Sequence, residues 1–387
     1  MPTIIRRRHI QNGIVAVPAT FSIFDDPESA LIPAAFVAGL ARCGTKLNQV
    51  IFDHSRLKEF DLVAESILDL VSMEYERERR PPKKKLKFKG VFPNDESAGR
   101  FIRGVGIIKN LDVTHEQISE NSESQLKMFR MASNRFLMES SVRTSDHKER
   151  VVKQFVDYVN RCLSVNSRKL TKDAVVRLVQ YTGEILDNAE EHSGTYDWNI
   201  AGYLDTMTEN DPVCEIAIFN IGRTIAETYQ RLDKSSFAWN NISPYISQHQ
   251  KSSFFNESWT EECLITLASL QGNVSSKNSS PGDDRGQGTI EMIRFFEKIA
   301  RECSEQGTEP ARMVVLSGNT HIKFDGMYRL GNDTQGRAII AFNEKNDLDY
   351  RPDSNYVRTM KNGYFPGVAV GIRFPLPSSQ ALDQDHD

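Results

Sequence analysis

The sequence predicts a mixed α/β (α+β) fold with two domains. Its 387 residues can form two or three units with cores of their own. Short strand-like runs alternate with helical periods early in the chain, whereas the second half opens with amphipathic helices followed by strands. The expected division is an N-terminal α/β domain over 1–112, a helical connector over 113–147, a second α/β domain over 148–378 and a tail over 379–387.

The N-terminal domain should alternate strands with helices. We expect strands within 14–24, 48–55 and 83–92 and helices over 29–44 and 60–80. Pro81 and Pro82 should end the second helix, because a residue before proline avoids the helical conformation. The strand VIFDHS and the helix after it resemble a strand-helix unit of the STAS-like domains found in bacterial regulators, which implies a regulatory role.

Composition and charge disfavour several classes of protein. The formal net charge of −4 is no footprint of a nucleic-acid binder, although the basic run over 77–90 leaves a local contact open beside the plainer alternative of a solvated strand edge. The five cysteines form no CxxC pair and should be reduced core thiols. No apolar run is long enough for a membrane helix, so we expect a cytoplasmic protein that does not bind a membrane.

The segment GEILDNAEEHSG, residues 183–194, places four acidic side chains on a predicted helix. Thr171 is the expected N-cap of this helix. One face is apolar and the opposite face is acidic, because residues three, four and seven apart stack along one side of a helix. The apolar face carries Val175, Leu178, Ile185 and Ala189, and the acidic face carries Glu184, Asp187, Asn188 and Glu191. A solvated helix face is the plain alternative for such a charge run.

Glu184 and Asn188 form a pair that suits phosphoryl transfer. Their spacing of four residues brings the two side chains about 6 Å apart on the helix. An amide oxygen can coordinate Mg²⁺, and a carboxylate can orient and deprotonate a water or a hydroxyl group. This division of roles is the one that phosphoryl transfer requires.

The stretches after this helix add the elements of a phosphate site. We expect strands over 196–205, 214–220, 311–319 and 367–377. Gly222 follows the second strand, where a glycine lets the backbone approach a flat ligand closely. A polar stretch over about 228–285, expected to form part of a lid, leads to Gly286 and Gly288, which precede a helix whose free N–H groups can hold phosphates.

The order GEILDNAEEH, FNIGRTI, RGQGTIEMI and PGVAVGIRFPLP resembles the N, G1, G2 and G3 boxes of the GHKL ATPases. The resemblance covers about residues 148–377 and implies the Bergerat fold, a histidine kinase-like α/β sandwich that binds ATP with Mg²⁺. It also implies that Glu184 is the general base and that Asn188 is the Mg²⁺ ligand. The further nucleotide-binding positions that it implies are Asn220, Gly222, Arg285, Gly286, Gly288 and Gly367.

Three positions depart from the pattern of the family. Asn220 stands where the family has an Asp that accepts the adenine amino group, Thr224 replaces the second G1 glycine, and Val368 replaces a threonine. The amide of Asn220 can still accept a hydrogen bond but lacks the charge of a carboxylate, so the affinity for adenine is open. Glu184 itself differs from the amide that sensor histidine kinases usually carry and matches the hydrolysing ATPases and anti-sigma serine kinases.

We therefore expect a Mg²⁺-dependent ATP-binding protein in which Glu184 activates water and hydrolysis drives a lid or dimer switch within a regulatory complex. Two alternatives remain open: an anti-sigma-like serine kinase that phosphorylates a partner, and a non-catalytic ATP or ADP sensor that switches partners. A co-encoded protein partner and a homodimer are both expected.

Overall fold

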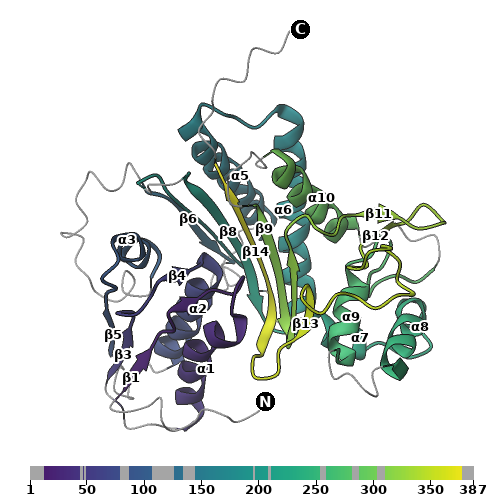
Figure 1. Cartoon of the computed structure of the whole chain (residues 1–387), viewed down its shortest axis with the longest axis horizontal. Coiled ribbons are helices and arrows are strands. Elements are labelled where there is room, and N and C mark those ends of the chain that lie inside the picture. Colours follow the sequence, from purple (N-terminus) through teal and green to yellow (C-terminus); the bar gives the residue numbers. More distant parts are fainter. Residues whose placement is uncertain are drawn as a thin grey trace.

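The computed structural model of the chain describes residues 13–43, 47, 49–78, 87–106, 126–133, 144–194, 197–207, 211–252, 259–280, 287–302 and 310–376. Helices and strands both contribute largely, as the sequence predicts for a mixed α/β fold. A seven-stranded sheet lies at the centre, with the N-terminal unit on one side and the long helices α5, α6 and α10 on the other (Figure 1). The chain is therefore arranged in layers around this sheet.

The N-terminal unit alternates strands and helices as expected. Its parallel sheet has the order β1-β3-β5, and a second pair of parallel strands joins β2 to β4. The strands are β1 (Ile14–Ala16), β2 (Thr20–Phe21), β3 (Gln49–Asp53), β4 (Glu59–Phe60) and β5 (Lys87–Val91), and the helices are α1 (Pro27–Cys43), α2 (Leu62–Glu78) and α3 (Glu96–Val105). Helix α3 was not expected, but Asp95 marks its start by accepting a hydrogen bond from the Ala98 N–H group.

The large sheet has the strand order β13-β10-β9-β14-β8-β7-β6, and all neighbouring strands are antiparallel. The four strands expected from the sequence in this half are found as β7, β8, β9 and β14. The bounds are β6 (Leu126–Ala132), β7 (Asn199–Asp205), β8 (Val213–Ile221), β9 (Arg312–Gly318), β10 (Thr320–Phe324), β13 (Val357–Thr359) and β14 (Phe365–Pro375). A small hairpin joins β11 (Gly331–Asn332) to β12 (Ala338–Ile339).

Helices α5 (Thr144–Leu163), α6 (Lys172–Ser193) and α10 (Gln287–Glu302) pack their apolar faces on one face of the large sheet. A short 3₁₀ helix over Ser164–Asn166 follows α5, and Thr171 caps α6 by accepting a hydrogen bond from the Ala174 N–H group, as expected. Three further helices stand at the β13 side of this layer: α7 (Ile225–Gln230), α8 (Phe237–Ser252) and α9 (Glu261–Ser269). Among the described helices, none is long and apolar enough to cross a membrane.

The expected helical connector over 113–147 needs a correction. Its described part contains β6, which forms the edge of the large sheet, and the following helix begins already at Thr144. The scattered Met, Phe and Leu side chains of this stretch belong to a strand that pairs with β7 from Leu126 to Ala132. Phe129 of β6 packs against Phe155 of α5, and this tertiary contact outweighs a weak local preference.

The central strands are buried on both faces, because alternate residues join two different cores. Ile216 and Ile218 of β8 pack with the helical layer. Ala217 and Phe219 of the same strand pack with the N-terminal unit. The large sheet therefore contributes one face to each of two cores, and the core of the N-terminal unit is completed by residues of the second expected domain.

A buried carboxylate ties the N-terminal unit to the sheet. Glu215 of β8 accepts a hydrogen bond of 2.7 Å from the Leu62 N–H group at the start of α2. Its Oε1 lies 3.8 Å from the Arg373 Nε atom on β14. Burial raises the pKa of Glu215 to about 7, and the nearby carboxylate of Asp61 acts in the same direction.

We predict that this carboxylate makes stability depend on pH. Between the ordinary pKa of about 4.5 and about 7, the folded chain keeps the Glu215 proton while the unfolded chain releases it. The contribution of Glu215 to the free energy of unfolding therefore falls as the pH rises from about 4.5 to about 7, and it stays constant above about pH 7. Glu215→Gln should remove this loss, so its advantage over wild type should grow by about 3 kcal/mol from pH 5 to pH 8. Denaturant unfolding at several pH values measures this difference, and a difference independent of pH would contradict it.

Candidate functional site

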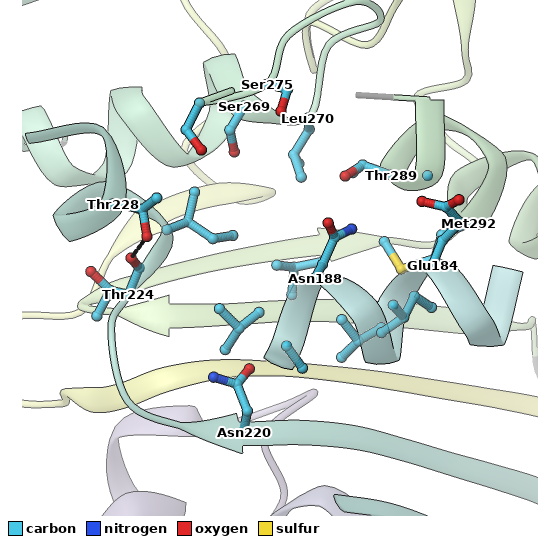
Figure 2. A pocket seen from close by; sticks show the side chains of 18 of the residues that line it. Glu184, Asn188, Asn220, Thr224, Thr228, Ser269, Leu270, Ser275, Thr289 and Met292 are labelled. Carbon is cyan, nitrogen blue, oxygen red and sulfur yellow. Dashed lines mark hydrogen bonds between the residues drawn. The ribbon is translucent and has the colours of Figure 1, made fainter. Parts of the chain in front are cut away.

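A cavity of about 190 Å³ lies between α6, the ends of β8 and β14, and the first turn of α10. Its floor is formed by apolar side chains of the sheet, and polar side chains enter from the surrounding helices and loops (Figure 2). The residues that line the cavity include Glu184, Asn188, Asn220, Arg223, Thr224, Thr228, Ser269, Ser275, Gly288, Thr289 and Val368. Segments that are about 180 residues apart in the sequence therefore meet in one pocket.

Helix α6 sorts its acidic side chains into two groups. Asp187 and Glu190 both form ion pairs with Lys148 of α5, the second at 2.6 Å. Glu184 and Asn188 instead line the cavity, as Figure 2 shows, and neither has a hydrogen-bond partner among the described residues. Both side chains are exposed. The pair predicted from the sequence thus faces the cavity, and its acidic neighbours serve to join two helices.

The first turn of α10 closes against this pair. A Cβ atom placed on Gly288 would lie 3.2 Å from the Glu184 Oε2 atom and 3.6 Å from the Asn188 Nδ2 atom. Glycine therefore lets the start of α10 approach the carboxylate and the amide closely. Thr289 follows it and also lines the cavity. Arg285 and Gly286, predicted for the same phosphate loop, lie outside the described residues.

Asn220 lies near the end of β8 at the sheet side of the cavity (Figure 2). Its side chain is only 4% exposed, yet its amide has no hydrogen-bond partner within the described part of the chain. Val368 of β14 stands directly opposite in the strand register and presents an isopropyl group to the cavity. The amide oxygen and nitrogen of Asn220 are not among the buried side-chain atoms that lack a partner, so they are open to the cavity. A ligand in the cavity could bond to both.

Gly222 and Gly367 shape the backbone around Asn220 rather than lining the cavity. The Gly222 N–H group donates to the Pro366 carbonyl oxygen at 3.0 Å, which joins the turn after β8 to the start of β14. Gly367 has a φ of +144°, and a Cβ atom there would lie 2.0 Å from the Asn220 carbonyl oxygen. Only glycine fits this close pairing.

Thr224 stabilises the start of α7, which accounts for a threonine instead of a glycine at this position. It is the N-cap of α7, with its hydroxyl accepting from the Glu227 N–H group at 3.0 Å and the Glu227 carboxylate accepting from the Thr224 N–H group at 3.0 Å. This capping box fixes the turn after β8. The departure from the glycine of the resembled family is therefore compatible with a well-formed turn.

Several lining residues were not predicted from the sequence. Arg223 lines the cavity, and its guanidinium group lies against Gly194 at the C-terminal end of α6, where a cation interacts favourably with the helix dipole. Thr228, Ser269 and Ser275 contribute hydroxyl groups from the stretch expected to be a lid. For Ser275 the sequence signal was the serine-rich composition around 274–288, which indicates a loop but not what the loop faces, whereas Arg223, Thr228 and Ser269 lie outside that stretch.

Much of the expected lid is helical in the structure. Helices α8 and α9 occupy most of its described residues, and Cys263, Leu264 and Ile265 of α9 are fully buried. The parts that reach the cavity are α7, the end of α9 and the connection after α9. The described segment therefore packs beside the pocket and lines it with residues of two helices and one connection.

The described side chains of the cavity offer too few oxygen ligands to hold a hard cation such as Mg²⁺ by themselves, so a bound ligand would have to supply further oxygen atoms. Within the described ranges, no group of three or more His, Cys, Asp or Glu side chains is placed to hold a metal ion. Asn188 and Glu184 offer an amide oxygen and a carboxylate beside each other, and Mg²⁺ usually takes one or two protein ligands together with phosphate oxygens and waters. The residues therefore fit Mg²⁺ that arrives with a phosphorylated ligand.

Comparisons with known proteins give no relative for this chain. No protein-family model matches it, no curated protein matches it, and no solved structure matches it.

Proposed function

We propose that this chain binds ATP with Mg²⁺ in the cavity and hydrolyses it with Glu184 as the general base. The observation that supports the proposal most directly is the meeting of Glu184, Asn188, Gly288 and Asn220 in one pocket. These four residues come from three segments that were singled out separately in the sequence. The resemblance to the GHKL ATPases suggests the same ligand.

The two ends of the cavity suit the two ends of a nucleotide. The base would lie on the apolar floor beside Val368 and bond to the amide of Asn220. The phosphates would lie between α6 and the start of α10, where Asn188 would hold Mg²⁺ and the helix N-terminus attracts negative charge. When bound, Mg²⁺ would neutralise charge on the phosphates.

Glu184 would accept a proton from a water molecule as the water oxygen attacks the γ-phosphorus. The new P–O bond forms while the bond to the β,γ-bridging oxygen breaks, so ADP leaves with the electron pair. Glu184 then returns the proton to solvent or phosphate. Its exposure among the described residues leaves room for the attacking water.

The N-terminal unit could transmit a conformational change caused by ATP binding and hydrolysis. It packs on the reverse side of β8 and β14, the strands that carry Asn220 and Val368. A shift of these strands on nucleotide binding would reach α2 through the Glu215 contact to Leu62. A protein partner or a second copy of this chain, in a regulatory complex in the cytoplasm, would bind differently before and after this shift.

The proposal is tested by phosphate release from Mg²⁺-ATP, measured beside binding of a non-hydrolysable ATP analogue. We expect saturable binding that weakens when Mg²⁺ is chelated, together with turnover by the wild-type chain. Absence of analogue binding at millimolar concentration would refute the proposed site. Transfer of label from γ-labelled ATP to a co-encoded protein, in place of free phosphate, would replace hydrolysis with a protein kinase reaction.

The exposure of Glu184 and Asn188 also favours a second candidate, a sensor that binds ATP or ADP without turnover. An exposed carboxylate without a hydrogen-bond partner is not held in one orientation, so it positions an attacking water less well than a carboxylate fixed in a closed site. Analogue binding without phosphate release, with different stabilisation by ATP and ADP, would identify the sensor.

A further inference from the structure

The Asn220 side chain carries both a hydrogen-bond donor and an acceptor into the cavity, and no described residue fixes which of the two faces the ligand. We propose that the base site accepts 6-oxopurine nucleotides, such as inosine triphosphate, as well as 6-aminopurine nucleotides. This inference rests on the proposed function, because it concerns the base of the nucleotide bound in that pocket.

The Asn220 amide can form hydrogen bonds with either kind of purine. An amide can accept from the 6-amino group of adenine and donate to a neighbouring ring nitrogen, which is a bidentate contact. After a half-turn about its last side-chain bond, the same amide can donate to the 6-oxo group and accept from the ring N1–H group of hypoxanthine. A carboxylate accepts only, so it would repel the 6-oxo group at the same place.

The surroundings of Asn220 leave both orientations available. Val368, its cross-strand neighbour, has no group that could bond to the amide. Ile218, two residues earlier on the same strand and also lining the cavity, is equally apolar. The Thr224 hydroxyl on the adjoining turn accepts from the Glu227 N–H group, and no hydrogen bond joins it to the Asn220 amide among the described residues. The described residues therefore impose no preference on the amide.

The rest of the base site should not distinguish the two purines. Val368, Val370 and Val315 offer apolar surface, which contacts ring faces without reading the 6-substituent. Discrimination between the two bases thus depends on Asn220. Since its amide can satisfy either base, discrimination should be weak.

The test compares equilibrium binding of ATP and inosine triphosphate to the wild-type chain with Mg²⁺, by calorimetry. These nucleotides differ at the 6-position and the associated N1 proton, so the comparison isolates the edge that Asn220 would read. We expect the two dissociation constants to agree within about tenfold, which corresponds to about 1.4 kcal/mol. A preference for ATP greater than tenfold would overturn the inference and leave ATP binding intact. Failure of both nucleotides to bind would overturn the proposed function as well.

Asn220→Asp provides the second arm, because it keeps the shape of the side chain and removes the donor. We expect it to weaken inosine triphosphate at least tenfold more than ATP. The matched control is Asp187→Asn, the reverse exchange at a residue that pairs with Lys148 away from the cavity, and it should leave the ratio unchanged. An unchanged ratio in Asn220→Asp would overturn the role of the amide. If that variant does not fold, the wild-type ratio alone decides.

Discussion

Phosphate release should fall at least about 100-fold in Glu184→Gln, while binding of an ATP analogue stays within about threefold of wild type. The amide keeps the size of the side chain and its place beside Gly288 but cannot take a proton from water. General-base catalysis contributes about 10²–10⁴-fold to such reactions, so turnover should suffer far more than affinity. Single-turnover release and analogue titration on the same preparation separate the two effects.

Asp187→Asn is the matched control for this substitution. It removes one carboxylate from the same helix, one turn away, but this carboxylate pairs with Lys148 and does not line the cavity. An exposed ion pair contributes about 1 kcal/mol at most, so stability and turnover should both change little. Equal turnover by Glu184→Gln and wild type would exclude Glu184 as the base, whatever the control shows.

Gly367→Ala should lower the free energy of unfolding by about 3 kcal/mol and weaken nucleotide binding at least tenfold. The new Cβ atom would lie 2.0 Å from the Asn220 carbonyl oxygen, in a backbone conformation with φ of +144°. Strands β8 and β14 would have to separate at the residue that carries the amide. Denaturant unfolding and calorimetric titration measure the two effects.

Gly326→Ala distinguishes this clash from simple backbone strain. Gly326 also has a positive φ, +87°, but no atom lies within 4 Å of the place where its Cβ would be. We expect a loss of about 1 kcal/mol from conformational strain alone, with nucleotide affinity unchanged. Equal effects of the two substitutions on affinity would show that the pairing at Gly367 does not position Asn220.

The sequence was sufficient to predict some of the residues that line the pocket, but not Arg223, Thr228, Ser269 or Ser275. Asn220 followed from the resemblance to the GHKL boxes, whereas Glu184 and Asn188 followed from the spacing on one helix and Gly288 followed from its place at a helix start. These are short-range patterns. Backbone geometry alone relates such neighbours, so no knowledge of distant packing was needed.

Contacts between distant segments were harder to predict. Strand β6 pairs with a distant partner, because β7 begins at Asn199, 67 residues after the end of β6 at Ala132. The serines that line the cavity are placed by the fold of α9, which no local pattern encodes. The N-terminal layer could have been anticipated in part. The run CEIAIFN shows little polar alternation, and such strands are covered on both faces.

Strand β14 is the last described element along the chain, yet it lies in the interior of the sheet between β9 and β8. During synthesis, β8 and β9 leave the ribosome before β14, so the edges that later pair with β14 are at first unpaired. Pairing across so long a stretch of chain is slow, so these edges stay unpaired for longer than the edges of strands that are close in sequence. Val368 and Val370 arrive with β14, so the cavity floor is completed only then. Nucleotide would consequently stabilise only those molecules whose synthesis has passed β14.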